Sequence, residues 1–421
     1  MLEHSDPKIF DLIQKETRRQ NDGLEMIPSE NHTSRAVLEA LGSRLTDKYS
    51  EGYPGMRYYG GNEFIDEIEM LAIERAKELF GVMHANVQPY SGSPANQAVC
   101  FALLNPGEKL MGMNLLYGGH LTHGWKVNFS GVYYQAVQYP TDHNGFLDYD
   151  EIEKLAKFER PKLIFVGATA YPRIFDFQRL AQIAKMIDAY LVADISHVAG
   201  LVVAGIHPSP VGHADVITTT THKTLRGPRG AMILCNGNPS QPLKPCERIR
   251  ENLPTLIDRA VFPGLQGGPH NHQTAAIAVA LKEADTQEFQ EYGKQIVANA
   301  KTLAEELSHG GLRLITDGTD NHLILADVTP LETTGKLAES LLGEIGITVN
   351  KNAIPFDTRK PFDPSGIRLG TPAITTRGMK EPEMRTIAQI ILETLQAPND
   401  EIKKKENKNK VSELCEKFPI H

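Results

Sequence analysis

The chain has 421 residues, of which 41% are hydrophobic and 23% are charged. This composition indicates an ordinary globular protein and excludes a disordered or fibrous one. Its 44 basic and 52 acidic residues give a net charge of -8, which opposes attraction to nucleic acid or anionic lipid, so neither partner is expected. The four scattered cysteines (Cys100, Cys235, Cys246 and Cys415) have no CxxC spacing, and we expect no disulfide framework and no metal site.

The first 62 residues resemble an arm more than a domain. Residues 5–20 carry apolar side chains at helical spacing, and a polar stretch rich in Gly and Tyr follows from 48 to 62. The N-terminus contains acids and lacks the apolar core of a secretory signal. No apolar run approaches the roughly 18 residues that a membrane span requires. We therefore expect a cytoplasmic protein in which segment 1–62 forms an N-terminal arm.

From residue 63 to about 285, short β-branched runs alternate with segments typical of helices. Parallel strands need such crossover connections, so the alternation predicts an α/β domain whose largely parallel sheet is covered by helices on both faces. The expected strands are HANVQPY, PKLIFVG, AYLVADIS, ADVITTTT and GAMILC.

Residues 286–421 are expected to form a smaller α+β domain, because a chain of this length exceeds what one core supports. A helix is predicted over 273–283, just before the boundary, and strands at NHLILADV and GITVNK. The basic run at 403–410 is interpreted as a solvated helix face or loop. Residues 237–259 are interpreted as a surface elaboration.

Lys223 carries the strongest local signal for chemistry. It follows a strand that ends in four threonines, and ligands of open α/β sheets bind outside the carboxyl ends of the strands. Asp194 ends another apolar strand, where it could simply cap the next helix. A lysine and an acid together suit pyridoxal phosphate, which needs an imine link and a partner for its ring nitrogen.

An anion cradle is predicted where Ser91, Gly92 and Ser93 turn into an apolar helix. Helix N-termini present free N–H groups and a partial positive charge, which suit a phosphate. A plain cap by Ser93, with Pro94 at the first helical position, explains the same residues without a ligand.

The chain resembles serine hydroxymethyltransferase from end to end. The resemblance rests on motifs that occur in the family's order: MIPSENHTS, DKYSEGYPGMRYYGG, VQPYSGSPAN, GGHLTHG, GATAYPR, ADISHVAGL, TTTTHKTLRGPRG, FPGLQGGPHNH, TDNHLILAD, TVNKNAIPFD and SGIRLGTPAIT. Several specify eight or more positions, which makes chance agreement negligible. The resemblance implies fold type I of the pyridoxal-phosphate enzymes, with an aspartate aminotransferase-like seven-stranded sheet, and a homodimer as the minimum unit.

The resemblance also implies residue roles at the cofactor. Lys223 would link pyridoxal 5'-phosphate, with His222 beside it, and Asp194 would bind the ring nitrogen. The other implied cofactor contacts are His120 stacked on the ring, Thr169 and His197 at its oxygen, Ser91, Gly92 and Ser93 at the phosphate, and Tyr49, Gly267 and Gly268 at the neighbouring subunit's phosphate.

For the substrates, the resemblance implies that Arg368 and Ser29 bind the carboxylate of serine. A planar guanidinium forks onto a carboxylate, which is the chemistry that this position needs. Glu51 and Tyr59 would handle protons near the hydroxymethyl group. Tetrahydrofolate, the co-substrate, would contact Leu115, Gly119, Leu121 and Asn352.

The sequence departs from the family pattern at five positions. Thr169 stands in place of the usual serine, Met56 of a basic residue, Tyr90 of histidine, Pro94 of glutamine and Ser196 of alanine. None removes a proposed catalytic side chain.

Two other functions remain open at this point. A folate-independent aldolase acting on threonine or another β-hydroxy amino acid would use the same Lys223, Asp194 and Arg368, and Glu51 and the region of Asn352 distinguish the two enzymes. A scaffold or RNA-binding protein without catalysis is opposed by those intact residues and by the acidic net charge.

Overall fold

The computed structural model describes residues 2–237 and 248–420. Contacts within the chain divide it into two compact units, which we describe separately: Thr33–Lys294, and Met1–His32 together with Gln295–His421. Most of the 237–259 segment that was expected to be a surface elaboration lies outside the described residues or forms the short helix α10 (Leu253–Arg259).

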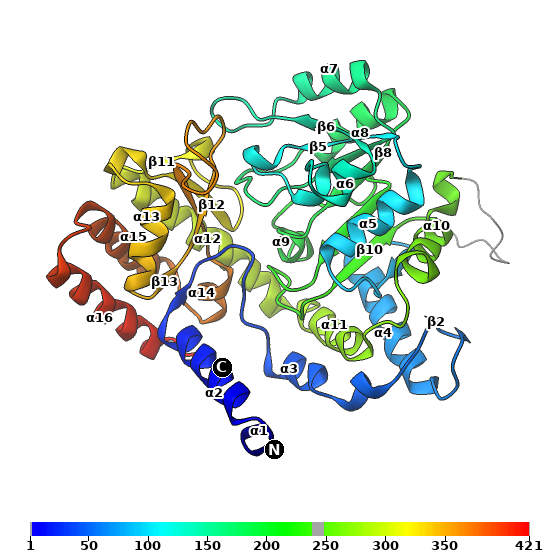
Figure 1. The fold of residues 1–421 in the computed structure, drawn as a ribbon, viewed down its shortest axis with the longest axis horizontal. Coiled ribbons are helices and arrows are strands. Elements are labelled where there is room, and N and C mark those ends of the chain that lie inside the picture. The colour runs from blue at the N-terminus through cyan, green and yellow to red at the C-terminus, as the bar shows by residue number, and fades with distance from the viewer. Residues whose placement is uncertain (1, 238–247, 421) are drawn as a thin grey trace. The chain divides into compact units, whose positions relative to one another are not determined.

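The unit 33–294 is built on a seven-stranded sheet (Figure 1). Its order is β4-β10-β9-β8-β7-β5-β6. Only β10 runs antiparallel to its neighbours, β4 and β9, and the other pairs are parallel. The strands are β4 (His84–Asn86), β5 (Lys109–Met113), β6 (Gln135–Tyr139), β7 (Leu163–Val166), β8 (Tyr190–Asp194), β9 (Val216–Thr220) and β10 (Ala231–Cys235). The predicted α/β class with a mostly parallel sheet is confirmed.

Both faces of this sheet are buried, as the alternation of side chains along its strands shows. Ile164 and Leu191 belong to one hydrophobic cluster, whereas their chain neighbours Phe165 and Val192 belong to another. Successive strand residues point to opposite faces, so the two clusters are the two sides of the sheet. Strands buried on both sides read as continuous apolar runs, which is why β7 and β10 were visible in the sequence.

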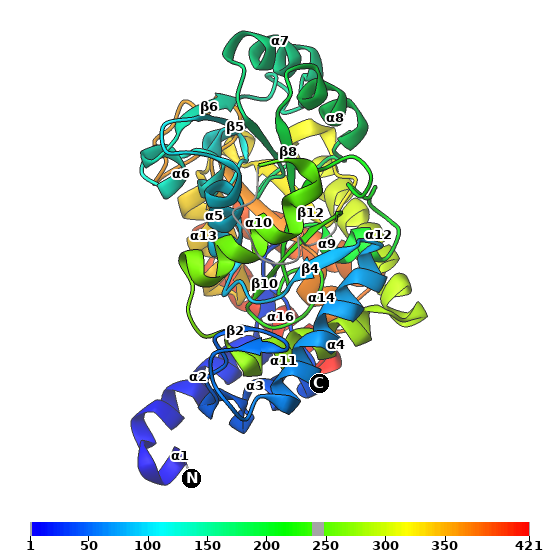
Figure 2. The same ribbon diagram turned by 90° about the vertical axis from the view of Figure 1, so that its right-hand side faces the viewer.

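Helices form those two layers (Figure 2). The first cluster contains side chains of α4 (Glu63–Phe80), α7 (Tyr149–Glu159) and α8 (Phe177–Met186), and the second contains those of α5 (Gly92–Leu103) and α10. Asp148 and Asp176 cap α7 and α8 through their carboxylates, which satisfies N–H groups that a helix start leaves free. The remaining helices of this unit include α3 (Arg35–Leu41), α6 (Phe129–Val132), α9 (Ala199–Val203) and α11 (Asn271–Ala284).

The second unit has a four-stranded antiparallel sheet of order β11-β12-β15-β14. These strands are β11 (Arg313–Leu314), β12 (Leu323–Asp327), β14 (Asn350–Asn352) and β15 (Gly366–Gly370), and β1 (Leu24–Glu25) pairs separately with β13 (Ile347–Thr348). Its helices include α2 (Pro7–Asp22), the later part of α12 (Gln287–His309), α13 (Gly335–Glu344), α14 (Pro372–Thr376), α15 (Glu381–Gln396) and α16 (Glu401–Lys417). The basic run at 403–410 lies on α16, one of the two structures expected for it.

One buried arginine ties the two ends of the chain together in this unit. Arg377 donates to the backbone oxygens of Asn21 and Gly23, at 3.1 and 2.7 Å, and of Cys415 and Phe418, at 3.0 and 2.6 Å. Five N–H donors on a rigid fork make arginine suited to several acceptors at once. The end of α2 is thereby fixed to the end of α16.

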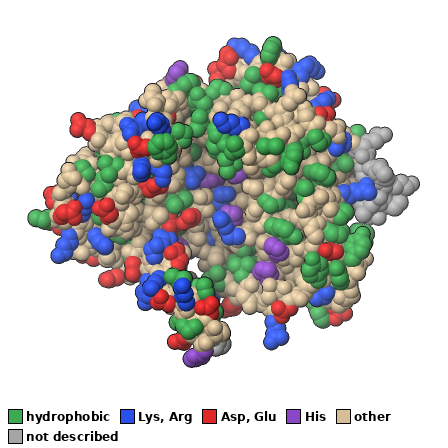
Figure 3. Space-filling model, viewed as in Figure 1, with side chains coloured by type: hydrophobic (Ala, Val, Ile, Leu, Met, Phe, Trp, Pro, Cys, Tyr) green, Lys and Arg blue, Asp and Glu red, His purple; other side chains and the backbone are tan. Residues whose placement is uncertain are grey.

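The mixture of basic and acidic residues in the composition is also seen on the surface. Figure 3 shows basic and acidic side chains interspersed on the face that it draws. Within the described residues, no helix is both long enough and apolar enough to cross a membrane. The three described cysteines, Cys100, Cys235 and Cys415, are free.

Candidate active site

A narrow pocket opens where the parallel strands of the larger sheet end. Asp194 is the last residue of β8, Thr220 is the last of β9, and Lys223 follows three positions later. Because β8 and β9 are parallel neighbours, with Asp194 opposite Thr218, their carboxyl ends meet at one edge. The pocket is lined by Gly92, His120, His123, Ala168, Thr169, Asp194, Ser196, His197, Thr220 and Lys223.

The amine of Lys223 is held by the strand that precedes it. Its Nζ donates to Oγ1 of Thr220 at 3.0 Å. The chain turns directly afterwards, since N of Arg226 donates to O of Lys223 at 3.0 Å and N of Gly227 to O of Thr221 at 2.7 Å. Arg226 has a φ of 60°, in the left-handed region that costs a non-glycine residue energy and is common near functional sites.

The carboxylate of Asp194 has hydrogen-bond partners on both oxygens. Oδ2 accepts from Nδ2 of Asn96 at 2.8 Å and lies 3.2 Å from Nε2 of His123. Oδ1 accepts from both N and Oγ of Ser196, at 3.1 and 2.6 Å. Burial alone raises the pKa of a carboxyl, but the hydrogen bond with His123, the electrostatic effect of His123 and the hydrogen bond from Ser196 outweigh it and lower the pKa of Asp194 well below its usual value. The group is therefore an anion at neutral pH.

His120, which lines the pocket, and His222, which precedes Lys223 in the chain, are both neutral at neutral pH. Burial lowers the pKa of His120 to about 4, and its Nδ1 lies 2.7 Å from Oγ1 of Thr122. Burial also lowers the pKa of His222 to about 3, assisted by the charges of Lys223 and Arg229. A neutral imidazole has no charge that repels a cationic ring. His120 therefore presents a flat, uncharged face to the pocket.

The residues of the predicted anion cradle lie at the start of α5. Ser91, not Ser93, is the N-cap residue, so Gly92 is the first helical residue and Pro94 the third. The hydroxyl of Ser91 makes no capping hydrogen bond, which leaves the first N–H groups of the helix available to a ligand. A Cβ on Gly92 would lie 2.7 Å from Cγ2 of Thr220, so only glycine fits there.

Thr169 lies on the other wall. Its hydroxyl donates to the backbone oxygens of Gly118 and Gly119, at 3.2 and 3.0 Å, and its N donates to Gly118 O at 2.7 Å. The hydroxyl oxygen keeps lone pairs that can accept from a ligand. The same loop carries Leu115 and the exposed Leu121, two of the residues predicted to contact folate.

A second cluster of predicted residues lies in the same unit but does not line this pocket. The rings of Tyr49 and Tyr59 meet edge to face with centroids 5.2 Å apart. A Cβ built on Gly267 would lie 3.1 Å from Oε1 of Glu51, and one on Gly268 would lie 3.2 Å from Cε1 of Tyr49. Tyr49, Glu51, Tyr59, Gly267 and Gly268 are therefore brought together with one another.

The remaining predicted residues belong to the other unit. Arg368 lies on β15, beside β14, and its Nε donates to Oδ1 of Asn350 at 3.0 Å. Burial lowers the pKa of Arg368 to about 10, so the guanidinium stays charged at neutral pH. Asn352 lies on β14 and donates to the backbone of Ala353 at 2.7 Å. Ser29 is half-buried in the segment after β1.

Sequence reasoning missed several residues that line the pocket or bond to Asp194. His123 was quoted within GGHLTHG without a role, although it follows His120 by three positions. Asn96 is a polar residue on the buried side of an apolar helix, a signal that could have drawn attention to it. Ser196 was noted only as a departure from the family pattern, and Thr220 only as part of a strand.

The group His120, His123 and Asp194 has ligand atoms within 4.8 Å of one another, a spacing that a metal ion could use. However, Nε2 of His123 already faces Asp194, and Nδ1 of His120 faces Thr122. A carboxylate and an amine at the same pocket suit a cationic ring with an aldehyde. The donor set therefore fits pyridoxal phosphate better than a metal.

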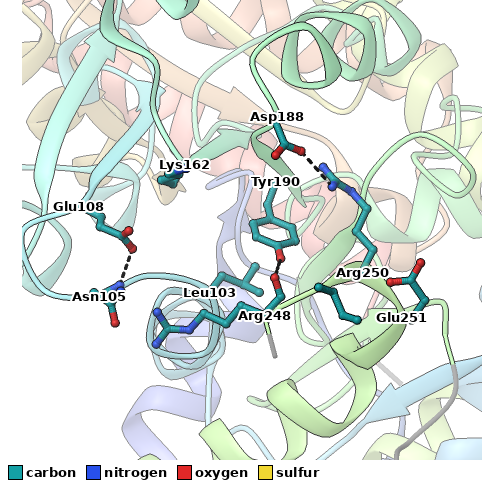
Figure 4. A pocket seen from close by; sticks show the side chains of 10 residues that line it. Leu103, Asn105, Glu108, Lys162, Asp188, Tyr190, Arg248, Arg250 and Glu251 are labelled. Atoms are coloured by element: carbon teal, nitrogen blue, oxygen red, sulfur yellow. Dashed lines mark hydrogen bonds and ion pairs between the residues drawn. The ribbon is translucent and has the colours of Figure 1, made fainter. Parts of the chain in front are cut away.

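A larger pocket, of about 440 Å³, lies at the opposite ends of the strands (Figure 4). Lys162 precedes β7 and Tyr190 begins β8. This pocket therefore lies away from the carboxyl ends of the strands, where ligands bind. The charged head of Arg250 is bonded there to Asp188 at 3.4 Å and to Asp215 at 2.7 Å. Arg250 is thus already paired with two acids.

Comparison with known proteins gives one family. The family model for serine hydroxymethyltransferase matches residues 2–391. A protein of Acidothermus cellulolyticus named serine hydroxymethyltransferase is 58% identical to this chain over 397 residues, which cover 94% of the chain and 90% of that relative.

Proposed function

Because the chain belongs to the serine hydroxymethyltransferase family, we propose that Lys223, Asp194 and Arg368 carry the family reaction. The enzyme is a pyridoxal-phosphate-dependent transferase of fold type I, which moves the hydroxymethyl group of serine to tetrahydrofolate and leaves glycine. The observation that carries the residue assignment is that the amine of Lys223 and the carboxylate of Asp194 line one pocket.

Bound pyridoxal phosphate supplies an electron sink for the bond that breaks in serine. Lys223 attaches the cofactor through Nζ, which the hydroxyl of Thr220 orients. Asp194 holds the proton on the ring nitrogen, because its low pKa keeps it an anion at the pH where the enzyme works. His222, a neutral neighbour of Lys223, assists proton movement at that amine.

The remaining walls orient the cofactor. Ser91, Gly92 and Ser93 bind the phosphate at the start of α5, where unpaired N–H groups and the helix dipole favour an anion. His120 stacks on the ring with its neutral face, and Thr169 and His197 bind the ring oxygen.

We assign Tyr49, Gly267 and Gly268 to the phosphate site of a neighbouring subunit, which makes a homodimer the working unit. Support comes from their grouping outside the Lys223 pocket. Segment 1–62 serves as the dimerisation arm in this proposal. Its helix α2 exposes Ile9, Leu12 and Ile13, and exposed apolar side chains that share one helix mark association surfaces.

For serine, Arg368 and Ser29 bind the carboxylate, since the guanidinium remains positive with a pKa of about 10. Glu51 and Tyr59 move the proton of the serine hydroxyl. Tetrahydrofolate binds along Leu115, Gly119 and Leu121, with Asn352 contributing an amide. The 63–285 segment is the cofactor domain and 286–421 the smaller domain in this assignment, and we place the enzyme in the cytoplasm.

A spectral titration separates this function from a folate-independent aldolase. Purified enzyme is expected to be yellow, and glycine added with tetrahydrofolate should produce a new visible absorption band. Glu51→Gln should reduce transfer to folate while leaving glycine binding intact, since the side chain keeps its size and loses its charge. If glycine and folate together leave the spectrum unchanged, the folate assignment is wrong, and the result favours a folate-independent aldolase.

A further inference from the structure

Ser196 makes two bonds to the same oxygen of Asp194. It lies two positions after Asp194, just beyond the end of β8, and it is buried. Its Oγ donates to Oδ1 at 2.6 Å, and its backbone N donates to the same atom at 3.1 Å. A hydroxyl that donates to a carboxylate forms a short, charge-assisted bond, roughly twice as strong as a neutral one.

The same hydroxyl also receives a bond from the neighbouring strand. N of Thr220 donates to Oγ of Ser196 at 3.0 Å. The side-chain oxygen of Thr220 accepts a hydrogen bond from the amine of Lys223. A continuous path therefore runs from the carboxylate of Asp194 through one serine hydroxyl to the residue that holds the lysine.

We propose that Ser196 is a positioning residue for the reaction: its hydroxyl fixes the carboxylate of Asp194 relative to Thr220 and sets how strongly that carboxylate supports positive charge on the cofactor. The proposal rests on the roles assigned above to Asp194 and Lys223. An alanine could close the same turn through its backbone N–H but could make neither hydroxyl bond. Serine at this position therefore adds an electrostatic element to the site.

The direction of the effect follows from the hydrogen bond. A donor to Oδ1 draws charge away from the carboxylate, so its removal leaves a denser negative charge beside the cofactor ring. The other titratable groups that line the pocket are His120, His123, His197 and Lys223, and His123 faces the other carboxylate oxygen, Oδ2. Without the Ser196 hydroxyl, a proton on the nitrogen that joins Lys223 to the cofactor should be held more tightly.

The test is a pH titration of the visible absorbance of the holoenzyme, which follows that proton directly. Ser196→Ala should raise the midpoint by roughly half a pH unit, a fraction of the one to two units that a charge-assisted bond is worth at the atom it touches. Ser196→Thr, which keeps the hydroxyl, should restore the wild-type midpoint. Ser196→Cys, a weaker donor, should give an intermediate value and replaces Ser196→Ala if that variant does not fold.

Two controls make the outcomes distinct. Thr394→Val removes a buried hydroxyl that likewise donates to an oxygen and accepts a bond, from Nδ2 of Asn407, so it reproduces the loss of stability alone. Asp194→Asn should lower the midpoint or release the cofactor. An unchanged midpoint in Ser196→Ala, with an altered Asp194→Asn, overturns the role of Ser196 only. No change in either variant overturns the role of Asp194 as well, and with it the proposed function.

Discussion

Asn96 donates from Nδ2 to Oδ2 of Asp194 at 2.8 Å, although 98 positions separate the two residues. Its other amide atom, Oδ1, accepts from Oγ1 of Thr218 at 2.7 Å, which fixes the orientation of the amide. The helix that we propose as the phosphate cradle and the strand that ends in the carboxylate are thus joined by one side chain. Positioning of this kind is what a preorganised site requires.

Replacement of Asn96 by alanine should weaken cofactor binding on the order of tenfold, the contribution of one hydrogen bond to a charged group. The loss also leaves the Thr218 hydroxyl without this acceptor. Equilibrium dialysis of pyridoxal phosphate measures the change. Thr394→Val is the matched control, because it lies in the other unit and should leave the dissociation constant unchanged; equal affinity in Asn96→Ala and wild type would refute the role.

Asp194→Asn should lower kcat/KM by at least about a hundredfold, because a charge aimed at the reacting group contributes a factor of this order. The substitution keeps the shape of the side chain and removes its charge. Steady-state transfer from serine to tetrahydrofolate provides the measurement. Asp215→Asn is the control, since that acid lies at the amino end of β9 and pairs with Arg250; similar losses in both variants would mean that stability, not the site, is responsible.

His32 should make stability depend on pH. Burial, assisted by the charge of Arg377, lowers its pKa to about 4 in the folded protein, against about 6.5 in the unfolded chain. The unfolded state therefore binds more protons between pH 4 and 6.5, so stability falls as the pH falls through this window, by about 1.4 kcal/mol for each pH unit at most. Urea unfolding at pH 7 and 5 should show a smaller drop for His32→Gln than for the wild type, and equal drops would contradict the assignment.

Arg377→Met should lower the free energy of unfolding by about 3 kcal/mol or more, because four backbone carbonyl oxygens, in one buried and three partly buried hydrogen bonds, lose their donor. Arg377→Lys should lie between, since a lysine cannot reproduce the planar fork. Chemical denaturation gives the values. A loss below about 0.5 kcal/mol in the methionine variant, typical of a surface substitution, would contradict this role.

The sequence predicted those strands whose residue pattern reflects their burial in the sheet. The strands predicted within PKLIFVG, AYLVADIS and ADVITTTT are confirmed as β7, β8 and β9, because strands buried on both faces are rich in apolar and β-branched residues. Strands β5 and β6 were missed, since KLMGM and QAVQY contain few β-branched residues. They form strands because they pair with each other and with the rest of the sheet, which the local sequence does not show. Likewise β15, which carries Arg368, was recognised only as a motif.

Some residues of the candidate site were likewise predictable from the sequence, and others were not. Lys223 and Asp194 were predictable because Asp194 ends one predicted strand and Lys223 closely follows another, and the ends of parallel strands meet. The partners Asn96 and Ser196 were not, because hydrogen bonds between distant segments leave no local pattern. The N-cap of α5 is Ser91, whereas the sequence suggested Ser93. The residue at which a helix begins depends on packing as well as on residue type.

The attachment of the cofactor to Lys223 is the central claim, and chemical trapping tests it most directly. Borohydride added to the holoenzyme reduces the link between the cofactor and its lysine, so that the pyridoxyl group stays on the peptide through digestion and mass spectrometry. We expect the added mass on the peptide that contains Lys223, and none after trapping of a folded Lys223→Ala variant. A label on a different lysine of the wild-type enzyme would contradict the account.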